Sequence, residues 1–194
     1  MGEIKVTFAA MEHLKYVNDI SEAIAEAARD KNSGLALRTP EYITERIKAG
    51  RGVIALDGEA LAGFCYINPW ENDLFVAHSG LIVKPEYRGR GLAKSLKQKA
   101  YELTRLRFPK AGIFGLTTSP AVKKINESLG YKAVPYNEIT NDIRFWKGCV
   151  SCVHYEVLCR NGFESCLCTA MLYKPEKNER NAFPENPGFH SGTD

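Results

Sequence analysis

A short basic turn rich in glycine is the stretch of this chain best suited to chemistry. The segment Arg88-Gly89-Arg90-Gly91-Leu92-Ala93 follows an apolar run over residues 77–83 and opens a stretch with helical apolar spacing. Glycine permits a sharp turn and a close approach of the backbone to a ligand. A helix start offers unpaired N–H groups and partial positive charge, and arginine suits phosphate. The turn therefore predicts a phosphate cradle between a strand and a helix, with a plain connecting loop as the alternative.

Cysteines form the second group of chemically capable residues. Cys149 and Cys152 are followed by Cys166 and Cys168. Four thiolates at this spacing can hold Zn²⁺, and a reducing cytosol would keep them from forming disulfides. The alternative is a hairpin of two strands around residues 160–162, in which the cysteines are small buried residues. Structural zinc is therefore a candidate cofactor, but not the favoured interpretation.

Length and composition bound the class of protein. The 194 residues, of which 44% are hydrophobic, predict one domain with a sizeable core. The 26 basic and 23 acidic residues are well mixed, which gives no nucleic-acid footprint. No apolar run reaches the roughly 20 residues that span a bilayer, and the N-terminus lacks the apolar region of a signal peptide. We therefore expect a cytoplasmic protein that binds neither nucleic acid nor membrane.

Hydrophobic periodicity predicts the elements that must position these residues. Helical spacing of apolar residues predicts helices over residues 11–29, 40–49, 92–105 and 120–129. Alternating or continuous apolar runs predict strands over residues 5–9, 53–56, 60–67, 74–83, 113–118 and 131–134. The order is β-α-α-β-β-β-α-β-α-β, which predicts an α/β fold.

These features together resemble the GNAT (GCN5-related N-acetyltransferase) superfamily. Its acyl-CoA signature is Arg or Gln, two residues, Gly, one residue, then Gly or Ala, which the segment 88–93 matches directly after Val-x-Pro-x-Tyr. A second match is the helix after Ser119, which ends in Leu-Gly-Tyr at residues 129–131. The resemblance implies a GNAT fold, with a mixed central sheet flanked by helices. It also implies direct transfer of an acyl group from acyl-CoA to an amine.

The same resemblance implies how CoA is held. Backbone groups of Leu81 and Val83, on the strand before the turn, would pair with the pantetheine arm. Amides of the turn would hold the pyrophosphate, which assigns to CoA binding the residues Arg88, Gly89, Arg90, Gly91, Leu92 and Ala93.

Two catalytic positions depart from the family pattern. Many relatives place a tyrosine acid where this chain has Asn126. Its amide cannot donate a proton at neutral pH but can hydrogen-bond the CoA sulfur, and an ordinary helix residue is the alternative. Relatives often carry a Glu or His base at positions that are Ala77 and Ser79 here. His78, between them, becomes the candidate base if a β-bulge re-aims it, with a structural histidine or a water-mediated base as alternatives.

Acceptor recognition rests on a closer resemblance. Segments 38–43, 145–149 and 166–172 are similar to a small GNAT group linked to arginine biosynthesis, for which N-acylation of glutamate with acetyl- or succinyl-CoA is proposed. Arg38 lies in a loop where its guanidinium would clamp a substrate carboxylate, unless it is simply solvated. Tyr66 is a candidate lining residue, with core packing as its alternative.

The expected protein is thus an N-acyltransferase with acetyl-CoA or another acyl-CoA as co-substrate and glutamate or a similar amino acid as acceptor. The alternatives are transfer to a protein N-terminus or lysine, and a non-catalytic acyl-CoA-binding regulator. We expect a GNAT core over residues 1–136, a Cys-rich β-hairpin extension over 137–174 packed on the core, and a polar flexible tail over 175–194. Homodimers are common among GNAT proteins, so a homodimer is a further expectation.

Overall fold

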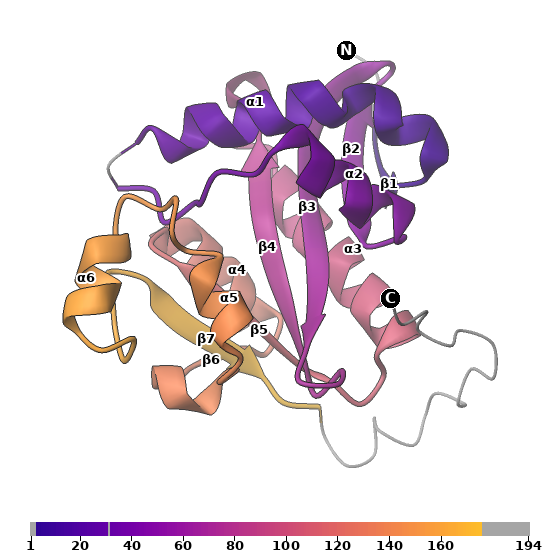
Figure 1. The fold of residues 1–194 in the computed structure, drawn as a ribbon. Coiled ribbons are helices and arrows are strands. Elements are labelled where there is room, and N and C mark those ends of the chain that lie inside the picture. The colour runs from indigo at the N-terminus through magenta and orange to yellow at the C-terminus, as the bar shows by residue number, and fades with distance from the viewer. Residues whose placement is uncertain (1–2, 31, 176–194) are drawn as a thin grey trace.

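A computed structural model describes residues 3–30 and 32–175, and residues 176–194 of the predicted tail lie outside this description. The described residues form a seven-stranded sheet with the order β1-β2-β3-β4-β5-β7-β6, covered by helices on both faces (Figure 1). The predicted α/β architecture is confirmed. No helix in these residues is both long enough and apolar enough to cross a bilayer.

The first half of the sheet is an antiparallel meander. Its strands are β1 (Ile4–Phe8), β2 (Gly52–Asp57), β3 (Ala60–Trp70) and β4 (Phe75–Val83). Between β1 and β2 the chain forms a 3₁₀ turn (Met11–Tyr16), α1 (Val17–Ala28) and α2 (Pro40–Lys48). Thr39 caps α2 by accepting a hydrogen bond from the Tyr42 N–H, and Pro40 fits the first turn because that turn needs no N–H donor.

The second half contains the parallel pair. A 3₁₀ turn (Pro85–Tyr87) and α3 (Leu92–Arg107) connect β4 to the parallel strand β5 (Gly112–Thr117). Helix α4 (Pro120–Ser128) then leads to β6 (Lys132–Ala133), and the last strand is β7 (Thr169–Tyr173). Strand β7 is antiparallel to both β5 and β6.

Strand β3 shows why its apolar run is continuous. Phe64 and Tyr66 pack with α1 and α2, whereas Cys65 and Ile67 pack with the apolar stripe of α3. A strand buried on both faces has no polar side, so it does not alternate. We call the two sides the α1 face, covered by α1 and α2, and the α3 face, covered by α3 and α4 (Figure 1).

The C-terminal extension differs from the expected β-hairpin. Residues 145–160 are not strands, because they contain α5 (Ile143–Lys147) and α6 (Tyr155–Arg160). Asp142 caps α5 by accepting from the Arg144 N–H, a signal that the apolar alternation nearby obscured. Trp146 and Leu158 pack beside Phe114 on the α1 face. The extension therefore closes that face with helices, and only β7 joins the sheet.

Candidate active site

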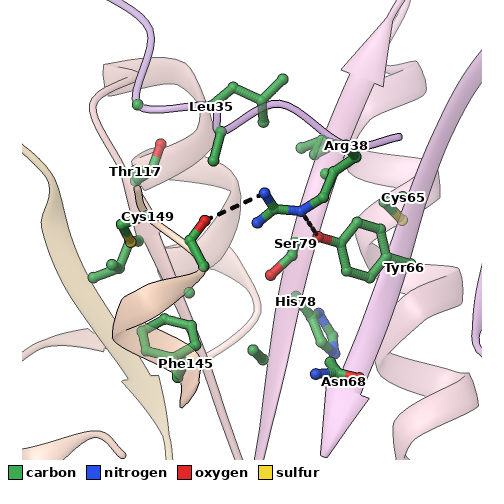
Figure 2. A pocket seen from close by; sticks show the side chains of 18 of the residues that line it. Leu35, Arg38, Cys65, Tyr66, Asn68, His78, Ser79, Thr117, Phe145 and Cys149 are labelled. Atoms are coloured by element: carbon green, nitrogen blue, oxygen red, sulfur yellow. Dashed lines mark hydrogen bonds between the residues drawn. The ribbon is translucent and has the colours of Figure 1, made fainter. Parts of the chain in front are cut away.

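A gap between β4 and β5 creates the site. The two strands pair only at Phe75–Ala77 and Gly112–Phe114, although both continue further. A pocket of about 760 Å³ lies where they part. Residues from β3, β4 and β5 line it, together with the loop over residues 33–39, helices α3 and α4, and segment 144–151 (Figure 2).

A β-bulge shapes the β4 side of this pocket. Phe64 of β3 faces Ile82, but Tyr66 faces Ser79, so β4 holds one extra residue. Gly80, within the bulge, has φ +63°, and a Cβ there would lie 2.4 Å from the Tyr66 ring. Only glycine satisfies both the backbone and the packing. The bulge therefore presents backbone of β4 to the pocket at Gly80.

The predicted phosphate turn lies where β4 leads into α3. Gly89 and Gly91 both have φ +76°, and α3 begins directly after Gly91 without a side-chain cap. Arg88 and Arg90 are exposed, and the Arg88 Nε donates to the Val83 carbonyl at 3.1 Å. The turn thus combines uncapped N–H groups with two accessible guanidinium groups, an arrangement that suits a pyrophosphate.

His78 faces α3, so the predicted re-aiming is wrong: the bulge comes after this residue. Its Nε2 lies 2.8 Å from the Thr104 hydroxyl, which itself donates to the Ala100 carbonyl at 2.9 Å. Because that hydroxyl proton is committed, Nε2 must carry the proton and Nδ1 must be the acceptor. The donors to Nδ1 are the Tyr131 hydroxyl at 3.1 Å and Lys97 Nζ at 3.4 Å.

This environment disfavours His78 as a base. Burial, and then the charges of Lys97 and Arg105, hold the pKa of His78 well below its usual value. A neutral imidazole whose lone pair already accepts hydrogen bonds is a poor proton acceptor. The geometry instead leaves His78 hydrogen-bonded to groups of α3 and to Tyr131.

Asn126 reaches the same pocket from α4. The side chain is 2% exposed, and its Nδ2 donates to the Met171 sulfur at 3.5 Å. Its Oδ1 has no partner among the described residues. A buried amide oxygen without a donor is costly, so this atom is suited to a donor on a ligand.

Arg38 spans the mouth of the pocket on the α1 face. Its Nε donates to the Tyr66 hydroxyl at 2.8 Å, and its Nη1 donates to the carbonyls of Leu37 at 2.7 Å and Gly148 at 3.3 Å (Figure 2). The guanidinium also lies 5.3 Å from the centre of the Tyr42 ring. Arg38 is therefore held in place rather than solvated, and within the described residues its Nη2 makes no hydrogen bond.

The lining of the pocket is rich in basic residues, two of which, Arg46 and Arg144, pair with carboxylates of Glu45 and Asp142 outside the lining. No aspartate or glutamate lines it in the described part of the chain, whereas six basic residues do: Arg38, Arg46, Arg51, Lys97, Arg144 and Lys147. Sequence reasoning identified Arg38 alone among them. The signal for Lys97 was present, since it interrupts the buried stripe of α3 between Leu96 and Ala100. The other basic residues come from distant segments, which periodicity cannot bring together.

A family model decides the identity of this arrangement. The acetyltransferase (GNAT) family matches residues 20–121, more than half of the 194 residues. The chain belongs to the GNAT family. It is an acyl-CoA-dependent N-acetyltransferase of the GNAT type, so an acyl-CoA is its co-substrate. Among curated proteins, none matches the chain.

Solved structures share the GNAT fold at low identity. Rv2747 from Mycobacterium tuberculosis, solved with CoA and NLQ, has a TM-score of 0.64 and 15% identity, over 89% of this chain and 99% of that chain. The yncA protein from Salmonella typhimurium, solved with its cofactor acetyl-CoA, has a TM-score of 0.64 and 17% identity, over 95% and 99%. N-acetylglutamate synthase from Neisseria gonorrhoeae, solved with CoA and N-acetyl-glutamate, has a TM-score of 0.59 and 14% identity, over 91% and 36%.

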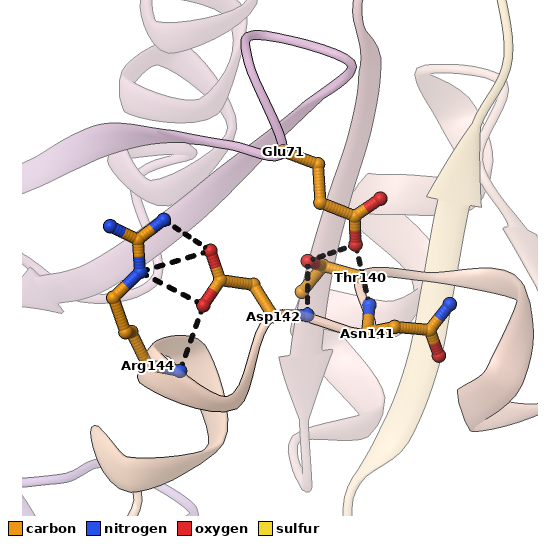
Figure 3. Close-up of polar contacts among 5 residues, drawn as sticks. All are labelled: Glu71, Thr140, Asn141, Asp142 and Arg144. Atoms are coloured by element: carbon orange, nitrogen blue, oxygen red, sulfur yellow. Dashed lines mark hydrogen bonds and ion pairs between the residues drawn. The ribbon is translucent and has the colours of Figure 1, made fainter.

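Polar contacts fix the α5 wall of this GNAT pocket to the β3–β4 turn (Figure 3). The Glu71 carboxylate accepts from the Thr140 hydroxyl at 2.7 Å and from the Asn141 N–H at 2.6 Å. The Trp146 indole donates to the Thr140 carbonyl at 3.0 Å. Glu71 itself has φ +50°, in the left-handed region. The turn thus adopts a costly conformation while holding the segment that carries α5.

The cysteines of this GNAT chain converge, but not as predicted. Cys149, Cys152, Cys166 and Cys168 line a second cavity of about 20 Å³ together with His154. Within the described ranges, no three His, Cys, Asp or Glu side chains are arranged to hold a metal ion, so the candidate zinc site, which was not the favoured interpretation, is not formed by these cysteines.

Other contacts occupy these thiols. The Cys166 sulfur lies 2.9 Å from the Tyr136 hydroxyl and accepts from the Cys168 N–H at 3.3 Å. Hydrogen bonds from the Cys168 thiol and the Tyr136 hydroxyl lower the pKa of Cys166 to about 5. Cys149 lines both cavities, so the thiol cluster forms part of the wall behind the main pocket.

Proposed function

We propose that this GNAT enzyme transfers an acetyl or succinyl group from acyl-CoA to the α-amine of glutamate or a similar acidic amino acid, a step of the kind that arginine biosynthesis uses. The observation that carries the proposal is the charge of the pocket, with six basic residues and no carboxylate along its described lining. An acidic amino acid brings two carboxylates to such a site, whereas a lysine-containing peptide brings cations that it repels.

Named residues fit the two ligands. For the acceptor, Arg38 is held by Tyr66 and keeps N–H groups available for a carboxylate. For CoA, backbone groups of Leu81 and Val83 would pair with the pantetheine arm, and the turn from Arg88 to Ala93 would hold the pyrophosphate. The unpartnered Oδ1 of Asn126 would accept a hydrogen bond from an N–H group of the bound acyl-CoA or acceptor.

No side chain in the described pocket is suited to deprotonate the substrate ammonium group. Neither Ala77 nor Ser79 can act as a base, and His78 faces α3 with its lone pair occupied. We therefore assign deprotonation of the ammonium group to a water-mediated route. Backbone N–H groups at the β4 bulge are the donors best placed for the oxyanion.

One of the similar solved structures holds an acidic product. The solved synthase from N. gonorrhoeae holds N-acetyl-glutamate, which is consistent with an acidic acceptor, but the present chain covers 36% of it at 14% identity. The choice of acceptor therefore rests on the charge of the pocket.

The test is CoA-thiol release in a grid of acetyl-CoA and succinyl-CoA against free amino acids and a lysine peptide. We expect turnover with glutamate or aspartate and little with lysine or the peptide. The faster donor identifies the acyl group. Release with the peptide alone would move the function to protein acetylation. Binding of CoA without release on any amine would favour the regulatory alternative.

A further inference from the structure

Lys97 is a buried cation without an anionic partner. It is 3% exposed on α3, and its side chain lines the pocket. Within residues 3–30 and 32–175, no carboxylate lies within ion-pair distance of it. Its polar contact is His78 Nδ1 at 3.4 Å, and the centre of the Tyr131 ring lies 5.0 Å away.

Burying the Lys97 ammonium costs free energy unless a ligand or neighbouring group satisfies its charge. An ammonium removed from water needs an anion or several acceptors, and a neutral imidazole satisfies only one of its three N–H groups. The other N–H groups remain available to a ligand. Burial also lowers the pKa of Lys97 to about 8, which makes its proton easier to release.

The position of Lys97 indicates which of the two reacting groups, the amine or the CoA sulfur, it can act on. Lys97 from α3 and Asn126 from α4 lie on the α3 face and line one pocket, opposite the arginine-rich α1 face. Asn126 occupies the place where many GNAT relatives carry a tyrosine acid, and its amide has no acidic proton. The chain therefore lacks that acid, yet has a dissociable proton on the same side of the sheet.

We infer that Lys97 is the catalytic acid for the leaving group, and that its ammonium protonates the CoA sulfur as the thioester breaks. The neutral amine attacks the thioester carbonyl, forming a C–N bond and an oxyanion. When the oxyanion collapses, the C–S bond breaks, its electron pair goes to sulfur, and sulfur takes a proton from Lys97 Nζ. Lys97 is then reprotonated by the proton that leaves the new amide nitrogen. The proton lost earlier by the substrate ammonium goes to water.

His78 supports this role as a positioning residue. Because Thr104 fixes the Nε2–H tautomer, Nδ1 keeps its lone pair as an acceptor that Lys97 shares with the Tyr131 hydroxyl. The inference rests on the proposed acyl transfer from acyl-CoA, and it does not depend on which amine accepts the acyl group.

The first test is a titration of CoA bound to the enzyme, which needs no acceptor. Thiolate formation is followed by its ultraviolet absorbance in the wild type, in Lys97→Met and in Lys99→Met, a control on the same helix whose amine pairs with Glu102. A neighbouring ammonium stabilises a thiolate, so the bound thiol should titrate about one pH unit or more lower in the wild type and the control than in Lys97→Met. Equal titration in all three proteins would overturn the inference.

The second test compares two acyl donors with whichever amine the enzyme accepts. Lys97→Met should lower kcat with acetyl-CoA by about 10²-fold or more, with little change in the KM for acetyl-CoA. The selenoester analogue of acetyl-CoA has a leaving group that needs no proton, so it should restore most of the rate. Equal losses with both donors would show that Lys97 only positions other groups. A raised KM for the acceptor with kcat unchanged would show that Lys97 binds the acceptor instead.

Discussion

The two faces of the sheet meet at one pocket, but they contribute different kinds of basic residue to it. On the α1 face, Arg38 makes three hydrogen bonds within the described residues, and Arg46 contacts Asn68. On the α3 face, Lys97 is buried with a neutral histidine as its partner. Arginine keeps its charge at every relevant pH, whereas a desolvated lysine exchanges its proton near neutrality. The first face is suited to holding an anion and the second to moving a proton.

Gly80 lies at the β4 bulge in the wall of the shared pocket, so a substitution that disrupts the bulge should have the largest effect. In Gly80→Ala the new Cβ would lie 2.4 Å from the Tyr66 ring at a backbone φ of +63°. We expect a loss of about 3 kcal/mol or more in the free energy of unfolding and a loss of activity above about 10²-fold. Urea unfolding and CoA-thiol release measure these effects.

Gly58→Ala is the matched control for this substitution. Gly58 has φ +59°, but a Cβ there would meet nothing within 4 Å. It should show only the conformational cost of about 1–2 kcal/mol, with activity retained. Similar losses in both variants would mean that packing against Tyr66 does not matter.

Removing Arg38 should damage the binding face alone. Arg38→Ala should raise the KM for an acidic acceptor by about 10- to 100-fold, because a charged hydrogen bond is worth about 1.5–3 kcal/mol. The KM for acetyl-CoA and the titration of bound CoA thiol should stay unchanged. Arg29→Ala, at an exposed position outside the pocket, is the control. Equal effects on both substrates would contradict a carboxylate clamp.

The α3 face predicts a pH dependence of stability. The pKa of Lys97 is about 8 in the folded chain and 10.5 in its ordinary state. Between these values the unfolded chain binds more protons, so the free energy of unfolding should rise with pH. Relative to Lys97→Met, the wild type should gain up to about 3 kcal/mol over this window. Denaturant unfolding of both proteins at several pH values measures the difference, and parallel curves would mean that Lys97 is not desolvated.

The smallest effect should follow from loosening the α5 wall. Glu71→Gln removes the charge from two short hydrogen bonds, which should lower the free energy of unfolding by about 1–2 kcal/mol. It should raise the KM for the acceptor and leave CoA binding intact. Glu59→Gln, in the exposed β2–β3 turn, removes only a surface ion pair with Lys15 and should leave both quantities nearly unchanged. A change in CoA binding alone would show that the α5 wall contacts CoA and not the acceptor.

Local patterns predicted much of this molecule. The order of elements from β1 to β6 and the glycine turn before α3 both depend on neighbouring residues, so the sequence itself displays them. The prediction of a hairpin around residues 160–162 was wrong in its first arm, because short apolar alternation is ambiguous between a strand and two short helices.

The contacts of the site could not be predicted in the same way. A bulge shifts pairing by one residue, and the isolated glycine within this strand, Gly80, is a sign of it that the periodicity of the apolar residues does not carry. The tautomer of His78 depends on Thr104, 26 positions away, and on Tyr131, 53 positions away. The positive charge of the pocket arises because separate segments converge on it, which only the folded structure reveals.

The position of β7 has a consequence for how the chain is made. This strand lies between β5 and β6, so the last strand of the described residues completes the middle of the C-terminal half of the sheet. Until residues 169–173 emerge during synthesis, β5 has one open edge and β6 has no neighbour. The GNAT core therefore cannot finish folding on the ribosome before its C-terminal segment is available, and the nascent chain must keep that edge from pairing elsewhere.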